Sequence, residues 1–231
     1  MRRAVVLIFA ASCEGSFAPK PLPELVVPPP PVVATSVRPL LLPPGESLIW
    51  EVHSGGIAIG RAELVVTGDE VHSRFSTNAL ASMLEPVRYE LDTALDRAAA
   101  RPARVDESIS VGGEVSRESA TFAGNRANLD AAHVDAPGPI HTLHSALGWL
   151  RANARLDAPP TLLYILHDRE LYRVEVGTPV RESLRDRPTL RFDVHAGDLG
   201  LVVWLSDDAE RIPVRIIAKV GDLHIVAELV T

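Results

Sequence analysis

The sequence predicts a mainly β domain, an antiparallel meander of about a dozen strands that forms a strongly curved sheet or half-open barrel. Three observations lead to this fold class. Apolar and polar residues alternate with a period of two over most of the chain after Glu46. Glycine pairs such as Gly55-Gly56 separate neighbouring runs, as hairpin turns do. One inserted segment, at about residues 140–154, has the spacing of an amphipathic helix.

The alternation is clearest in residues 88–96, where Arg88 and Asp92 share one face while Tyr89 and Leu91 share the other. This pattern is typical of an antiparallel strand with one face in water. Similar runs predict further strands at residues 47–53, 57–67, 105–111, 115–122, 162–166, 171–176, 189–195, 199–205, 214–220 and 223–230.

The expected helix places Leu143, Leu147 and Leu150 at helical intervals. This apolar stripe must pack on the sheet, either across the open end of the curve or on its concave face. We therefore expect the three leucines, together with Leu91 and Trp204, to line any site for an apolar ligand.

The N-terminus has the pattern of an export signal. Arg2 and Arg3 precede a short apolar run, and residues 1–12 are the expected signal peptide. Cys13, the only cysteine, follows Ala-Ala-Ser as in the lipobox of bacterial lipoproteins, so we expect it to be acylated. The expected location is the periplasmic face of a bacterial membrane, or the soluble periplasm if ordinary signal cleavage occurs instead. The run is too short for a transmembrane helix.

The rest of the chain divides into a linker and one domain. Residues 13–45 contain the lipidation site and a proline-rich linker, which could reach roughly 100 Å from an anchor if fully extended. Residues 46–231 are long enough for a single β domain with its own core. No disulfide is possible there, so this core must supply the stability. The net charge of −7, with both signs interspersed, argues against a nucleic-acid partner.

Candidate catalytic groups are few. His141 and His144 lie one helical turn apart and Asp168 follows later, so these three form the candidate cluster of a periplasmic hydrolase or metalloenzyme. The sequence contains neither the Gly-x-Ser-x-Gly nucleophile elbow nor a phosphate-binding glycine loop. Glu107 and Glu118 alternate along what we expect to be solvent faces. We therefore expect no catalytic residues, no metal site and no cofactor.

A turn near the C-terminus has its own chemistry. Asp207 and Asp208 follow an expected strand and can cap the backbone N–H groups of the turn. Arg211 is close enough to pair with one of them, and Pro213 suits the start of the next strand.

Several segments together resemble a known family. They are residues 50–60, the helix at 145–151, Leu171-Tyr172, the Trp-Leu-Ser-Asp-Asp turn within 203–208, and the Arg-Ile-Pro-Val-Arg segment at 211–215. This combination resembles the exported bacterial family catalogued as domain of unknown function 3108. The resemblance covers nearly all of the expected domain and implies an envelope protein of mostly antiparallel β structure. It implies no established activity and no catalytic residues.

Two classes of function are compatible with these observations. The favoured one is a non-enzymatic cell-envelope module that binds a lipid or other apolar ligand, or an envelope protein partner, in the concavity of the sheet. The alternative is the hydrolase or metalloenzyme that would use His141, His144 and Asp168.

We predict that Cys13→Ser moves the protein from the membrane fraction to the soluble periplasm or blocks its maturation. Each buried CH₂ of an acyl chain contributes about 0.8 kcal/mol, so two or more chains anchor a protein stably. Cell fractionation followed by immunoblotting checks this prediction. Equal membrane association of the parent and the variant would contradict lipidation.

Overall fold

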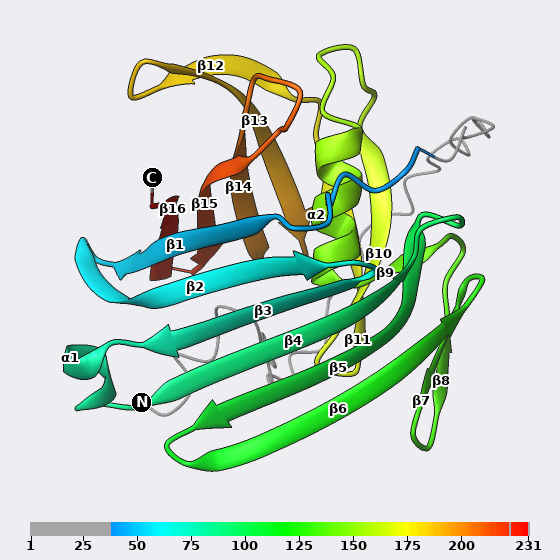
Figure 1. The fold of residues 1–231 in the computed structure, drawn as a ribbon, viewed down its shortest axis with the longest axis horizontal. Helices are drawn as coiled ribbons and strands as arrows, with labels where there is room; N and C mark the ends of the chain where they lie inside the picture. The colour runs from blue at the N-terminus through cyan, green and yellow to red at the C-terminus, as the bar shows by residue number, and fades with distance from the viewer. Residues whose placement is uncertain (1–37, 222, 231) are drawn as a thin grey trace, which may run out of the picture.

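The computed structural model describes residues 38–221 and 223–230, which form one sheet of sixteen strands and two helices (Figure 1). Cys13 and the expected signal peptide lie outside the described residues. The sheet is strongly bent without closing into a barrel, and this confirms the predicted fold class.

The strands and helices have the following bounds. The first half of the sheet comprises β1 (Ser47–Ser54), β2 (Ile57–Thr67), β3 (Glu70–Thr77), β4 (Val87–Asp96), β5 (Arg101–Val111), β6 (Glu114–Ala123), β7 (Arg126–Leu129) and β8 (His133–Asp135). The second half comprises β9 (Ile140–His141), β10 (Thr161–His167), β11 (Glu170–Val176), β12 (Val180–Leu184), β13 (Arg187–Ala196), β14 (Leu199–Ser206), β15 (Pro213–Val220) and β16 (Leu223–Leu229). The helices are α1 (Ala79–Ser82) and α2 (Leu143–Ala152).

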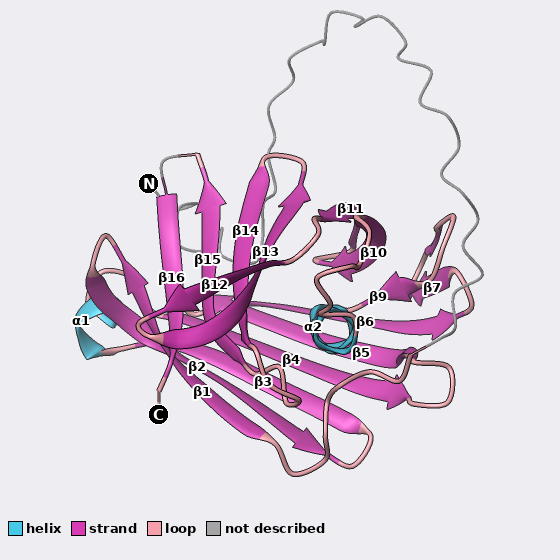
Figure 2. Cartoon of the chain, turned by 90° about the horizontal axis from the view of Figure 1, so that it is seen from above, coloured by secondary structure: helices cyan, strands magenta, loops and turns pink. Residues whose placement is uncertain are grey.

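Two meanders are joined edge to edge by β1 and β16, the first and the last strand. One meander runs outward from β1 to β8, and the other runs from β16 back to β9, with β12 paired to β13 beside this path. Neighbouring strands are antiparallel except β9 and β10. The bend brings β9 into contact with β5, and α2 lies in the hollow between the two meanders (Figure 2).

The expected strands are all present, with ends that differ by a few residues. The sequence pattern does not predict β3, β12 or the short strands β7 to β9. In β3 the only large apolar side chains are Val71 and Phe75, four residues apart, so the alternation is weak. This strand is held by its backbone pairing with β2 on one side and β4 on the other.

The helix α2 is shorter than the expected 140–154. Ile140 and His141 form β9 and pair with β10 instead of entering the helix. Thr142 is the N-cap, and its side chain and that of Ser145 form a capping box that satisfies backbone N–H groups. The helix therefore begins at Leu143.

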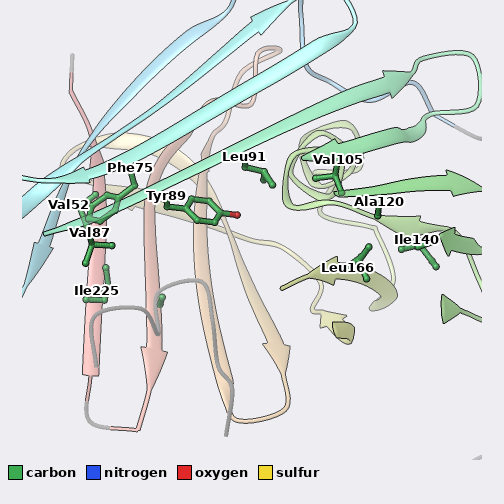
Figure 3. Close-up of a cluster of buried hydrophobic side chains, with 12 residues drawn as sticks. Val52, Phe75, Val87, Tyr89, Leu91, Val105, Ala120, Ile140, Leu166 and Ile225 are labelled. Atoms are coloured by element: carbon green, nitrogen blue, oxygen red, sulfur yellow. The ribbon is translucent and has the colours of Figure 1, made fainter. Parts of the chain in front are cut away.

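Three hydrophobic clusters make up the core, and all three contact α2. Leu143 packs against the cluster that contains Tyr89 and Leu91. In Figure 3, Leu166 of β10 and Ile140 of β9 face the side chains of β5 and β6 across this cluster. Leu150 belongs to the cluster between α2 and strands β10 to β14, with which Leu143 also packs. The helix is thus surrounded by the sheet instead of covering one side of it.

The third cluster extends the fold into the expected linker. Leu40 and Leu42 are buried there, and Leu147 of α2 packs against the cluster. A Cβ added at Gly148 would lie 2.8 Å from a methyl carbon of Leu42, so only glycine permits this close approach. The packed part of the chain therefore begins ahead of the expected boundary at Glu46.

A buried ion pair holds α2 in place. Arg151, in the last turn of the helix, is fully buried and donates two hydrogen bonds to the carboxylate of Glu46, at 2.6 and 2.7 Å. The same guanidinium donates to the carbonyl oxygen of Glu210, at 2.8 Å. Arg151 thus joins the helix to the start of β1 and to the turn between β14 and β15.

We predict that Arg151→Met lowers the free energy of unfolding by about 3 kcal/mol or more, since it leaves the carboxylate of Glu46 unpaired in the interior. Urea denaturation measures this loss. The control Arg173→Met removes an exposed guanidinium of β11 and should change stability by less than about 0.5 kcal/mol. The double variant Arg151→Met/Glu46→Met should recover most of the loss, and a double variant as unstable as the single one would contradict the prediction.

Candidate functional site

The five residues expected to line an apolar site are all buried or partly buried: Leu91, Leu150 and Trp204 are buried, and Leu143 and Leu147 are half-buried. Leu91 is buried in the first cluster, and Leu143, Leu147 and Leu150 pack into the clusters around α2. Their side chains contact protein on several sides. The hollow of the sheet is therefore occupied by the helix and by the core that forms around it.

Trp204 lies apart from these four residues. Its neighbours on β14, Val203 and Leu205, belong to the core cluster, so Trp204 points to the opposite face of the strand. There its indole N–H donates to the carboxylate of Glu182 on β12, and the guanidinium of Arg215 lies 5.5 Å from the ring centroid. The structure therefore does not bring Trp204, which is 9% exposed, into the cluster that contains Leu91.

His141 and His144 are buried, and each ring contacts a hydroxyl group. His141 Nδ1 lies 3.2 Å from Ser145 Oγ, and His144 Nδ1 lies 3.0 Å from Thr93 Oγ1 on β4. Burial lowers the pKa of His141 to about 4 and that of His144 to about 3, so both rings are neutral at pH 7. In the described residues, no group of three or more His, Cys, Asp or Glu side chains is arranged to hold a metal ion.

A polar cluster that the sequence pattern does not predict lies between β5 and the β10–β11 hairpin. Glu107 is buried instead of facing solvent as expected, and its Oε1 lies 2.8 Å from Nδ1 of His167. Its Oε2 accepts a hydrogen bond from the backbone N–H of Asp168, at 3.2 Å. The ring of Tyr89 meets the imidazole of His167 edge to face, with centroids 6.1 Å apart. These contacts join β5 to a hairpin about sixty residues later in the chain.

The environment of this cluster shifts two pKa values. Burial raises the pKa of Tyr89 well above its ordinary value, and the neighbouring charge of Glu107 adds to the shift. Burial by itself would also raise the pKa of Glu107, but contacts with His167, the N–H of Asp168 and the hydroxyl of Tyr89 outweigh it and lower that pKa. The carboxylate of Glu107 is therefore charged and the phenol of Tyr89 is neutral. The contacts of this carboxylate hold the β10–β11 hairpin against β5.

The C-terminal turn has the predicted chemistry. Asp208 Oδ1 accepts hydrogen bonds from the backbone N–H groups of Glu210 and Arg211, at 2.9 and 3.0 Å. The guanidinium of Arg211 donates to Asp207 Oδ1 at 2.6 Å, and β15 begins at Pro213. Both the capping and the pairing predictions are confirmed.

Exposed apolar side chains gather at one end of the first meander. Met83 and Leu84, in the connection between β3 and β4, are 84% and 91% exposed. Leu80 in the same connection and Ile57 at the start of β2 are also largely exposed. We refer to Ile57, Leu80, Met83 and Leu84 as the apolar tip.

Hydrogen bonds hold the apolar tip against both neighbouring hairpins. The side chain of Asn78 donates to the carbonyl oxygen of Ala58 at 2.6 Å, and its backbone N–H donates to that of Ile59 at 2.9 Å. On the other side, the N–H of Gly112 donates to the carbonyl oxygen of Pro86 at 3.0 Å. The β3–β4 connection is therefore supported on both sides while its apolar side chains remain in water. Neither helix in the described part of the chain has the length and apolar character to cross a membrane.

Comparisons with known proteins place the fold but not the function. No protein-family model matches the chain, and no curated protein does. Among solved structures, it is similar to a β-barrel-like protein of domain of unknown function 1849 from Brucella abortus. The TM-score is 0.61 with 12% sequence identity, over 80% of this chain and 95% of that one.

A second structure, a protein of the family named duf1089 from Pseudomonas aeruginosa, has a TM-score of 0.46 with 13% identity, over 68% of this chain and 89% of that one. Neither neighbour carries the family name that the sequence resembles, so that membership stays a prediction. The chain is a β-barrel-like domain.

The two buried histidines predict a loss of stability in acid. Below pH 6.5 the unfolded chain protonates both rings, whereas the folded chain does not do so until about pH 4 for His141 and about pH 3 for His144. Unfolding is thus coupled to proton uptake, and the free energy of unfolding falls as the pH falls through this range. Between pH 7 and pH 5 each histidine should account for a loss of about 2 kcal/mol.

Urea denaturation at the two pH values checks this prediction. His144→Asn keeps an atom close to the position of Nδ1, which meets Thr93, and should remove about half of the loss. The control His195→Asn changes an exposed ring on β13 and should show the same loss of stability between pH 7 and pH 5 as the parent. An unchanged pH dependence in the His144 variant would show that this ring does not remain neutral.

Proposed function

We propose that this chain is a non-enzymatic domain of the cell envelope, anchored through acylated Cys13, that inserts the apolar tip into the surface of the lipid bilayer. The observation that carries the proposal is the exposure of Met83 and Leu84 on a connection that is hydrogen-bonded on both sides. Large apolar side chains that gather on a supported loop mark an interaction site. The bilayer is the occupant because the expected anchor keeps the domain beside it.

The energies are sufficient for a tethered domain. Removal of a fully exposed Met or Leu side chain from water contributes about 1.5–3 kcal/mol, so Met83 and Leu84 together contribute about 3–6 kcal/mol. This gives weak but measurable binding by an untethered chain at high lipid concentration, and a tether strengthens it because it raises the effective concentration.

The geometry also permits contact with the bilayer. The chain enters the sheet at the start of β1, at the end opposite to the tip, and the eleven residues of β2 span about 36 Å between the two ends. Residues 14–37 would span about 75 Å at the 3.1 Å per residue of a polyproline chain, which exceeds that length.

The other functions considered from the sequence have less support. An apolar ligand in the hollow would compete with α2 and the side chains that pack around it. A hydrolase or metalloenzyme would require His141, His144 and Asp168 to act together. The two rings instead contact Ser145 and Thr93.

Vesicle flotation tests the proposal with the purified full chain carrying Cys13→Ser, so that no acyl chain contributes. This chain should float with phosphatidylcholine vesicles, since residues 78–86 contain no Lys or Arg and the contact requires no anionic lipid. Met83→Ser/Leu84→Ser should reduce the bound fraction at least about tenfold, from the lost transfer free energy. The matched control Leu156→Ser/Val180→Ser removes two exposed apolar side chains elsewhere and should bind like the parent. Equal binding by the tip variant and the control, or no binding by the parent, would refute membrane contact through the tip.

A further inference from the structure

A recess of about 490 Å³ lies at the end of the molecule opposite to the apolar tip. Its lining includes four arginines, Arg38, Arg151, Arg155 and Arg211, and no acidic residue. We refer to it as the arginine recess. Three of the four are paired with carboxylates that lie outside the lining: Arg151 with Glu46, Arg155 with Asp157 and Arg211 with Asp207.

The four arginines come from separate segments that the fold brings together. Arg38 precedes β1, Arg151 and Arg155 lie in and after the last turn of α2, and Arg211 lies in the turn before β15. Leu40, Leu41 and Ala209 supply apolar lining between them. The recess therefore combines cationic groups with an apolar surface.

Hydrogen bonds with the protein position the arginine side chains, but some of their N–H groups have no acceptor among the described residues. Arg38 donates only a long hydrogen bond, 3.4 Å, to the carbonyl oxygen of Ala152 among the described residues. The Nε of Arg151 is buried and has no hydrogen-bond partner in the described part of the chain. Arg155 pairs with Asp157, which does not line the recess. Each guanidinium has five N–H donors, so the two exposed arginines, Arg38 and Arg155, retain donors that a ligand can reach, whereas those of Arg151 are buried.

The backbone at Arg211 gives a second observation. Its φ is +51°, in the left-handed region that a non-glycine residue adopts only at a cost in free energy. The strain is held by Asp208, which accepts the N–H of Arg211, and by the contact between the guanidinium and Asp207. This backbone conformation fixes the position of Arg211 beside the recess.

From this combination we infer that the arginine recess binds an anionic amphiphile, a carboxylate or phosphate group carried on an apolar chain. Guanidinium groups match the planar geometry of carboxylate and phosphate oxygens. The apolar lining accounts for the body of the ligand, and the volume is that of a site for a small molecule. This inference is independent of the apolar tip, which lies at the other end of β2.

Calorimetric titration of the full chain with dodecyl phosphate, below its critical micelle concentration, tests the inference. Arg38→Gln/Arg155→Gln should weaken binding at least about tenfold, because two charge-assisted contacts are lost. Both side chains are on the surface, so the variant should remain folded. The matched control Arg173→Gln/Arg187→Gln removes two exposed guanidiniums from other strands and should bind like the parent. Ala209→Trp, which fills the recess without a change in charge, should also abolish binding.

Further titrations distinguish the source of the anion. Dodecyl maltoside has the same chain without the charge and should not bind, and inorganic phosphate should bind at least about tenfold more weakly than dodecyl phosphate. Inorganic phosphate that binds as tightly as dodecyl phosphate would overturn the amphiphile in favour of a free anion. Binding only to vesicles that contain phosphatidylglycerol, and not to the monomer, would overturn it in favour of a lipid headgroup. Equal binding by the recess variant and its control would overturn the site itself.

Discussion

The buried contact between Arg151 and Glu46 is the interaction on which the arrangement of this fold depends. A guanidinium with no exposure is stable only where its charge is balanced, and here Glu46 supplies two acceptors and Glu210 a third, while Nε has no hydrogen-bond partner among the described residues. These partners lie 105 and 59 residues away from Arg151. One side chain thus joins α2 to the start of β1 and to the turn between β14 and β15.

This placement of α2 determines what the sheet can bind. Because the helix lies inside the curve, all three hydrophobic clusters form around it, and the space that a more open β sheet would offer to a ligand is used for packing. Surfaces for partners therefore remain at the ends of the molecule. The apolar tip and the arginine recess lie at opposite ends, about the length of one strand apart, so occupation of one leaves the other accessible.

The Glu107–His167 contact also joins segments that are far apart in the chain. It ties β5 to the β10–β11 hairpin without a backbone ladder between the two. A carboxylate held charged in the interior by hydrogen bonds gives orientation rather than much net stability. The polar cluster and the arginine pair therefore specify how the two meanders lie, while the apolar clusters supply most of the free energy.

By itself the sequence determined the elements whose signal is local. The alternation in β4, the helical spacing of Leu143, Leu147 and Leu150, and the capping chemistry of Asp208 all act within a few residues, so they could be predicted. Only the tertiary structure decided that Glu107 is buried, that Trp204 faces away from Leu91, and that four distant arginines share a recess. Pairing between residues far apart in the chain decides which face of a strand turns inward and which segments meet at its ends. No local pattern of side chains encodes that pairing.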